Sequence, residues 1–131
     1  MVKDKKNLQE TATTTGPVAV EDATYESKLR ASLEEINDSD GIIGYILRNT
    51  NTASIDLKDP TKIIDYAVLS SSTFDAGQSL SDAFGLSDVK SIIVGGKNAK
   101  MLCMLVEENK ISIFMMKDAE ADKVLKRMRA H

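Results

Sequence analysis

Two neighbouring stretches near the C-terminus, residues 101–106 and 111–116, are apolar at almost every position. A strand with one face in water alternates between apolar and polar side chains in an antiparallel sheet. These two stretches do not alternate, so each predicts a strand that is buried on both faces. The sequence therefore indicates a sheet with helices on both sides, which is a three-layer arrangement.

Periodicity and turn residues place the other elements. Tyr25, Leu29, Leu33 and Ile36 recur at helical spacing and predict a helix over residues 23–36. Further strands are predicted over residues 41–48, 53–57 and 89–94. The predicted fold is α/β (α+β), a three-layer α-β-α sandwich around a five-stranded antiparallel sheet, with elements in the order α-β-β-α-β-β-β-α.

Two helices complete this order. Asp59 and Pro60 favour the start of a long helix, because an aspartate caps a helix and proline fits its first turn. Gly85 is the expected stop of that helix. Asp118 is expected to cap a final helix that ends near Arg129.

Composition sets the class of protein. Residues 1–20 are polar and without periodicity and are expected to form a flexible N-terminal tail, which leaves one domain over residues 21–131. The net charge of −3 argues against a nucleic-acid partner. The longest apolar run is far shorter than the roughly 18 residues of a membrane span, and no signal peptide is visible. The single cysteine, Cys103, fits a reducing compartment, so we expect a cytoplasmic protein.

The long helix has more apolar surface than one sheet face needs. One stripe contains Ile63, Ala67, Ser70, Phe74, Gly77 and Ser81, and a second contains Leu69, Thr73, Ala76, Leu80 and Ala83. Tyr66 lies between the stripes, and the combined arc is about 200° wide against about 100° for an ordinary surface helix. Two interpretations remain open. The helix lies deep in its own domain, or one stripe packs on the sheet and the other on a symmetry-related copy.

The strand at residues 89–94 points to the same surface. It would form an edge of the sheet and contains Ser91, Ile92 and Ile93 with few charges nearby. An apolar edge strand tends to pair with another chain unless it is covered. The sequence therefore predicts a homodimer interface made of Tyr66, Leu69, Thr73, Ala76, Leu80, Ala83, Ser91, Ile92 and Ile93.

The chain offers few groups for catalysis. Its only histidine, His131, is the last residue, and Cys103 lies within an apolar strand, where it is expected to be a buried hydrophobe. Gly95, Gly96 and Lys97 lack the spacing of a phosphate-binding loop and are expected to form a hairpin turn. We therefore expect no enzyme, and no catalytic, metal-binding or cofactor-binding residue.

These elements resemble the roadblock / dynein-light-chain family, a relative of the profilin-like and longin folds. The resemblance covers about residues 25–128 and rests on the GIIGYILR strand, the Pro60-initiated helix, the Gly-Gly hairpin and the KISIFMMKDAEADKVLKRM ending. The turn at residues 49–52 differs from the Asp-Gly turn that is frequent in the family. The resemblance implies a homodimer or heterodimer joined through the long helix and the third strand.

The resemblance also implies a binding function. The favoured interpretation is a non-enzymatic adaptor or regulator of a Ras-like small GTPase. The alternative is a structural light chain or scaffold subunit of a larger assembly, independent of nucleotide state. A small-molecule sensor is a third class, although the strands have few polar side chains besides Ser91 and Ser112 to orient a ligand between sheet and helix.

Overall fold

The computed structural model describes residues 20–87 and 89–129, and it describes side chains from residue 27 onward. The predicted tail at residues 1–20 and the side chain of Tyr25 fall outside this part of the chain, apart from the backbone of Val20, which begins the first helix. The elements are α1 (Val20–Asn37), β2 (Ile42–Arg48), β3 (Ala53–Leu57), η3 (Pro60–Lys62), α2 (Ile63–Phe84), β4 (Ser91–Gly95), β5 (Ala99–Val106), β6 (Asn109–Met116) and α3 (Ala121–Arg129).

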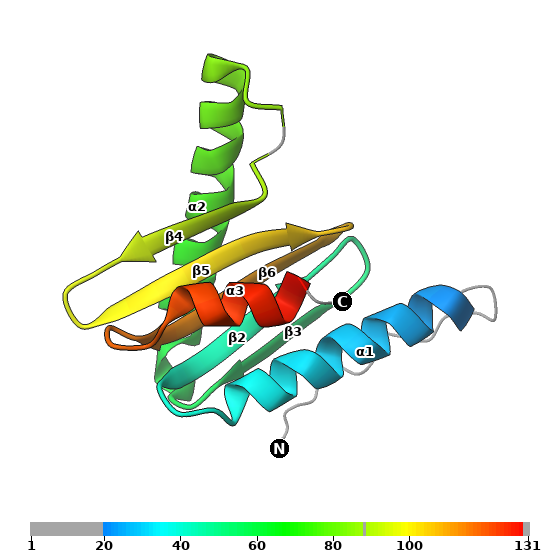
Figure 1. The fold of residues 1–131 in the computed structure, drawn as a ribbon, viewed down its shortest axis with the longest axis vertical. Coiled ribbons are helices and arrows are strands. Elements are labelled where there is room, and N and C mark those ends of the chain that lie inside the picture. Colours follow the sequence, from blue (N-terminus) through cyan, green and yellow to red (C-terminus); the bar gives the residue numbers. More distant parts are fainter. Residues whose placement is uncertain (1–19, 88, 130–131) are drawn as a thin grey trace.

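The strands form one antiparallel sheet in the order β3-β2-β6-β5-β4 (Figure 1). The hairpins β2–β3, β4–β5 and β5–β6 join neighbours in the chain, and β6 closes the sheet by pairing with β2. The central strands β5 and β6 are the two stretches that are apolar at both parities. The predicted order of elements and the antiparallel sheet are confirmed.

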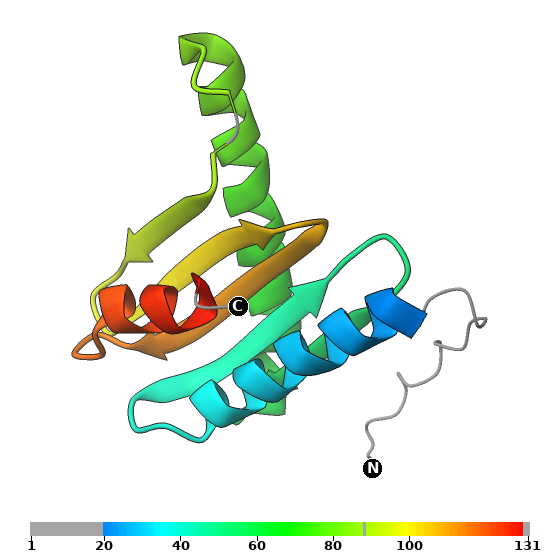
Figure 2. The ribbon, with the colours of Figure 1, turned by 45° about the vertical axis from the view of Figure 1, so that its right-hand side comes forward.

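Two hydrophobic cores lie on the two faces of the sheet. The first is formed with α1 and α3 and contains Leu33, Leu102, Ile113 and Met128, among others. The second lies beneath α2 and includes Met101, Cys103 and Phe114. Successive residues of β5 therefore point to opposite cores, which explains why its sequence does not alternate. The three-layer prediction is confirmed (Figure 2).

The ends of the long helix follow local chemistry. Asp59 accepts hydrogen bonds from the backbone N–H and the hydroxyl of Thr61, at 3.1 and 2.6 Å, which holds the pKa of that carboxyl below its usual value. The first turn, η3, is a 3₁₀ turn that leads into α2. Gly85 ends α2 in the left-handed conformation, with φ of 63°, as the sequence predicts.

The start of the last helix differs from the prediction. Helix α3 begins at Ala121 rather than directly after Asp118, so Asp118 lies in the preceding turn and does not occupy the capping position. The backbone N–H groups of Lys123 and Val124 donate to the carbonyl oxygen of Glu120, so Glu120 rather than Asp118 precedes the first helical residue. Ala119 follows a turn onto the end of β6, where its N–H donates to Met116, and this turn delays the helix.

Helix α2 is not confined to the area of the sheet. Its first half crosses the second core, and its C-terminal turns extend beyond the sheet on the side where β4 begins (Figures 1 and 2). Ser81 lies in this extension, and its hydroxyl donates to the backbone carbonyl of Ser87 in the loop that returns to β4. The extension therefore rests on its own returning loop and on the start of an edge strand.

Candidate protein interface

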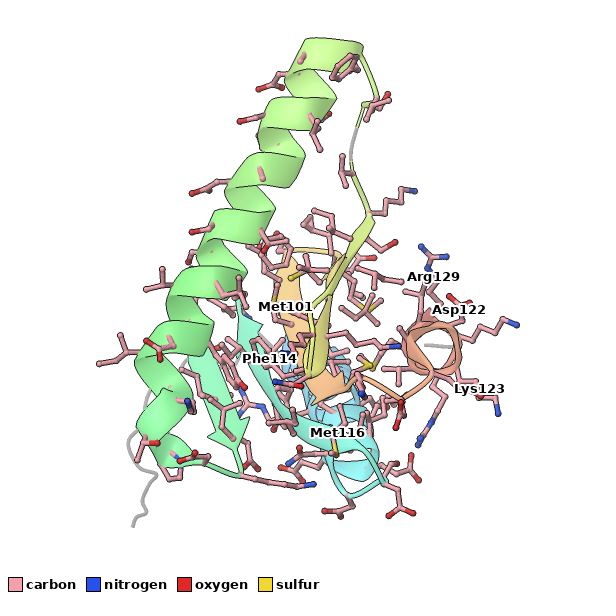
Figure 3. The ribbon with its side chains drawn as sticks, turned by 90° about the vertical axis from the view of Figure 1, so that its left-hand side faces the viewer. Met101, Phe114, Met116, Asp122, Lys123 and Arg129 are labelled. Atoms are coloured by element: carbon pink, nitrogen blue, oxygen red, sulfur yellow. The ribbon has the colours of Figure 1, made fainter. Side chains whose placement is uncertain are left out.

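Two side-chain contacts fix the direction of α2 on the sheet. The rings of Tyr66 and Phe114 are stacked, with centroids 4.4 Å apart and planes 11° from parallel. One helical turn later, the hydroxyl oxygens of Ser70 and Ser112 are 2.6 Å apart. Four helical residues and two strand residues each span about 6 Å, so α2 runs antiparallel to β6. Figure 3 shows Phe114 and Met101 pointing from the sheet toward α2.

Two further contacts fix the rotation of the helix. The Arg48 side chain of β2 donates to the Ser71 hydroxyl at 3.2 Å, so this side of α2 faces β2. Gly77 lies against β4, since a Cβ atom placed on it would be 2.7 Å from Cδ1 of Ile92. A side chain at position 77 would displace the end of the Ile92 side chain. The stripe with Ile63, Ala67, Ser70, Phe74, Gly77 and Ser81 is therefore the one that faces the sheet and β4.

The second apolar stripe is largely uncovered in the single chain. Leu69 is 41% exposed and Leu80 is 51% exposed, and Ala76 and Ala83 are also exposed. At 100° per residue, Leu69, Ala76 and Leu80 lie roughly 140–180° around the helix from Ser71. Because Ser71 faces β2, the uncovered stripe lies on the opposite side of α2, toward the β4 edge of the sheet.

Three of the residues predicted to form the interface contribute to the packing of the single chain. Tyr66 is half-buried against Phe114, and Ile92 packs in the second core. Thr73 is buried, and its hydroxyl donates to the carbonyl of Leu69 at 2.8 Å. Thr73 is therefore the one member of the predicted α2 stripe that is buried within the single chain, and it lies at the margin of the stripe nearest the sheet.

Strand β4 is an edge of the sheet, as the sequence predicts. Within residues 20–87 and 89–129 it pairs only with β5, so one side of its backbone is open to another strand. Ile93 is 47% exposed and is paired with Leu102, and Ser91 is paired with Met104. Those partners belong to the core with α1 and α3, so Ser91 and Ile93 lie on the face opposite to α2.

A separate group of exposed apolar side chains was missed by the sequence analysis. Ile64 is 76% exposed and Val68 is 60% exposed, and both lie on the outer side of α2. Ile55 of β3 is also exposed, and it faces the α2 side of the sheet because it pairs with Ile46 of the second core. The sequence could have indicated this group, because Ile64 and Val68 are apolar residues on the arc of the helix that otherwise carries Asp75 and other polar side chains.

The groups considered for chemistry in the sequence have the following surroundings in the structure. Within residues 20–87 and 89–129, no three His, Cys, Asp or Glu side chains gather into a metal-binding group. Burial raises the pKa of the Cys103 thiol, and the hydrogen bond with Ser112 only partly offsets this. Gly95 and Gly96 form the β4–β5 hairpin, in which the N–H of Gly96 donates to Ala99 at 2.8 Å. In the same part of the chain, no helix has the length and apolar character needed to cross a bilayer.

Comparison with known proteins gives a consistent picture of the fold. No family model and no curated protein sequence matches the chain. Among solved structures, a Roadblock/LC7 domain from Streptomyces avermitilis is 16% identical with a TM-score of 0.62, over 77% of this chain and 85% of that one.

Two MglB structures are also similar. The gliding protein MglB from Thermus thermophilus is 15% identical with a TM-score of 0.63, over 92% of this chain and 89% of that one. An MglB with a tetrameric arrangement is 16% identical with a TM-score of 0.64, over 92% and 88% of the two chains. The order of elements, the three layers and these similarities agree: the chain has the fold of the roadblock/LC7 domain.

Proposed function

We propose that the protein is a dimeric, non-enzymatic adaptor or regulator that binds a Ras-like small GTPase. The observation that carries this proposal is the uncovered stripe of α2 beside the open edge of β4. A copy related by a two-fold axis would cover Leu69, Ala76 and Leu80 and could pair its own β4 with this edge. The resemblance to the roadblock family supports a GTPase as the further partner.

The dimer is tested by adding a charge to the stripe. We call the surface of Leu69, Ala76 and Leu80 that the second copy would cover the proposed seam. Leu80→Asp places a carboxylate in this seam, where it would have to be buried without a partner. We expect the variant to be a folded monomer in light scattering after gel filtration. Ser79→Asp is the matched control, because it adds the same charge one residue away at an exposed position outside the stripe. A folded dimer of Leu80→Asp would contradict the proposed seam.

The edge strand is tested independently. Ile93→Asp places a charge beside the open edge of β4, on the face opposite to α2. A charged side chain on an edge strand disfavours pairing between sheets. We expect Ile93→Asp to weaken the dimer, and an unchanged dissociation constant would restrict the interface to α2.

The partner is tested on the second exposed group, Ile64, Val68 and Ile55. These residues are on a different side of α2 from the seam, so they would remain accessible in the dimer. Calorimetry against small GTPases from the same genome, loaded with GDP or a GTP analogue, should show binding that Val68→Asp removes while the dimer persists. Absence of binding in both nucleotide states would contradict the GTPase assignment. Co-purification of a non-GTPase partner would favour a structural light chain.

A further inference from the structure

A cleft lies on the α3 side of the sheet, on the face opposite to α2 and next to the start of β4. It has a volume of about 410 Å³ and lies between the start of β4, the end of β5 and the last turn of α3. Its lining consists of Lys90, Met104, Leu105, Val106, Met128 and Arg129. Ligand-binding pockets commonly have volumes of about 300–1,000 Å³, so the cleft can hold a small molecule.

The floor of the cleft is apolar and adaptable. Met104 and Met128 are almost fully buried, with exposed fractions of 2% and 1%. Val106 packs against the same core at the margin of the cleft. Unbranched thioether side chains adjust to the shape of an apolar group more easily than branched ones. The floor is therefore suited to the hydrocarbon part of a ligand.

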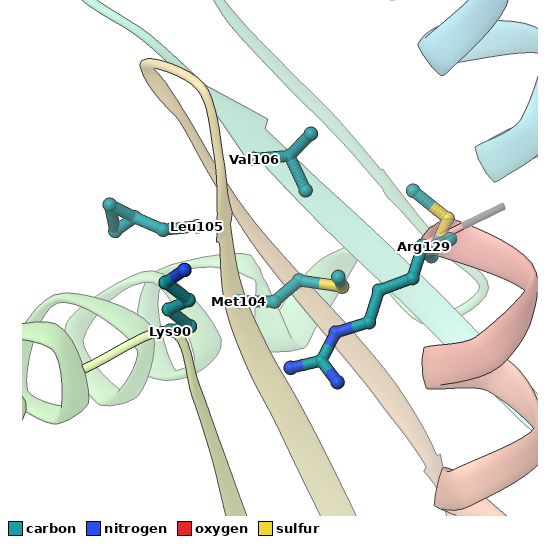
Figure 4. Close-up of a pocket in the computed structure, with 6 residues that line it drawn as sticks. Lys90, Met104, Leu105, Val106 and Arg129 are labelled. Carbon is teal, nitrogen blue, oxygen red and sulfur yellow. The ribbon is translucent and has the colours of Figure 1, made fainter. Parts of the chain in front are cut away.

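Among the described residues that line the cleft, Lys90 and Arg129 are positively charged and none is acidic. Figure 4 shows Arg129 extending from α3 across the cleft, with Met104 between it and Lys90. Within the described residues, neither Lys90 nor Arg129 forms an ion pair or hydrogen bond through its side chain. Two other cations of α3 do have partners: Lys123 lies 2.9 Å from Glu120, and Arg127 lies 3.1 Å from Glu35.

We propose that this cleft binds a small amphipathic monoanion, a carboxylate carried on a short hydrocarbon chain. Lysine and arginine both bind carboxylates through charge-assisted hydrogen bonds, and the methionines would contact the chain. The carbonyl end of α3 carries partial negative charge close to Arg129 and repels an anion more strongly as the anion's charge rises. A polyphosphate therefore fits less well than a monoanion. The inference does not depend on the proposed function, since none of the cleft residues belongs to the α2 stripe or to the exposed group of Ile64, Val68 and Ile55.

The test uses the full chain and octanoate, followed by amide chemical shifts in two-dimensional NMR. We expect saturable binding that shifts the amides of residues 104–106, 128 and 129. Octanamide has the same chain without the charge, and octylammonium has the opposite charge. Both should bind more weakly than octanoate.

Variants assign the binding to the two cations. Lys90→Gln and Arg129→Gln remove exposed charges and should preserve the fold. Each should weaken octanoate binding about threefold, and the double variant about tenfold. Lys126→Gln is the matched control, because it removes the same charge from an exposed position of α3 that does not line the cleft.

Several results would overturn the proposal. Equal affinity for octanamide would show that the cations do not recognise the carboxylate. An equal loss of affinity in Lys126→Gln would reduce the effect to net charge. Shifts confined to other parts of the chain, or no saturation below the concentration at which octanoate forms micelles, would remove the site itself.

Discussion

The hydroxyl of Ser70 in α2 lies 2.6 Å from the hydroxyl of Ser112 in β6, and both side chains are buried. Ser112 is also 3.3 Å from the sulfur of Cys103 on β5. A buried polar group that loses its partner costs more than the hydrogen bond itself contributes. This short polar chain therefore fixes the position of α2 along the sheet, because a shifted helix would separate the buried hydroxyls of Ser70 and Ser112.

We predict that Ser70 and Ser112 are coupled in stability. Ser112→Ala should lower the free energy of unfolding by about 2 kcal/mol, because the Ser70 hydroxyl stays buried without this partner. Ser70→Ala with Ser112→Ala should cost clearly less than the sum of the two single changes. Denaturant titration of all four proteins measures the coupling, and strictly additive values would contradict it. Ser72→Ala, at an exposed position of the same helix, is the control.

Gly44 is predicted to be intolerant of any side chain. A Cβ atom there would lie 2.4 Å from the carbonyl oxygen of Asp56 and 2.8 Å from Cα of Leu57, both of which are backbone atoms. Gly44→Ala should therefore destabilise the protein by about 3 kcal/mol, because the β2–β3 hairpin must open. Gly95→Ala is the matched control, since no atom beyond its two chain neighbours lies within 4 Å of the point that its Cβ would occupy. Equal melting temperatures for the two variants would refute this reason.

Tyr45 should make stability fall at high pH. Burial, followed by the nearby charges of Glu34 and Asp56, raises its pKa from 10.0 to about 12. The unfolded chain loses the phenol proton near pH 10 while the folded protein keeps it. The stabilisation is complete below pH 10 and is lost as the pH rises from 10 to 12.

The matching experiment compares the wild type with Tyr45→Phe. A shift of two pKa units corresponds to about 3 kcal/mol, so the wild type should lose up to this amount relative to Tyr45→Phe between about pH 9 and 12. The difference between the two proteins isolates this group from the other titrating side chains. Parallel stability profiles would mean that folding does not raise the pKa of Tyr45, which would contradict the prediction.

Cys103 should react only after unfolding. Cys103 is 1% exposed and burial raises the pKa of its thiol, whereas the reactive form of a cysteine is the thiolate. Iodoacetamide at about pH 8 should leave the native protein unmodified over hours and should modify the denatured protein fully. Mass spectrometry gives the readout, and rapid labelling of the native protein would indicate that α2 separates easily from the sheet.

The layers of the fold could be predicted because burial on both faces leaves a direct mark on a strand sequence. In β5, Met101 and Cys103 face one core while Leu102 and Met104 face the other, so no polar position remains to give an alternating pattern. Gly85 predicted the end of the long helix, and Asp59 predicted the start of the helical segment, although its first turn is 3₁₀ and α2 itself begins at Ile63. The prediction for Asp118 was wrong because a local turn, in which the N–H of Ala119 donates to the carbonyl of Met116, delays the helix to Ala121.

The candidate interface was harder to predict because a helical wheel has no reference direction. It separated two apolar stripes but could not show that Thr73 is buried within the chain while Ile64 and Val68 are exposed. That distinction comes from the contacts of Ser71 with Arg48 and of Gly77 with Ile92, which join residues distant in sequence. The cleft beside Arg129 has the same origin, because β4, β5 and α3 meet there only in the folded chain.

The extension of α2 beyond the sheet has a thermodynamic consequence. The turns around Leu80 and Phe84 gain little from hydrophobic burial in a lone protomer, because both side chains are exposed. If a second copy covers them, assembly supplies part of the free energy that holds this end of the helix. The melting temperature should then rise with protein concentration, and amide hydrogen exchange near the helix end should slow as dimers form.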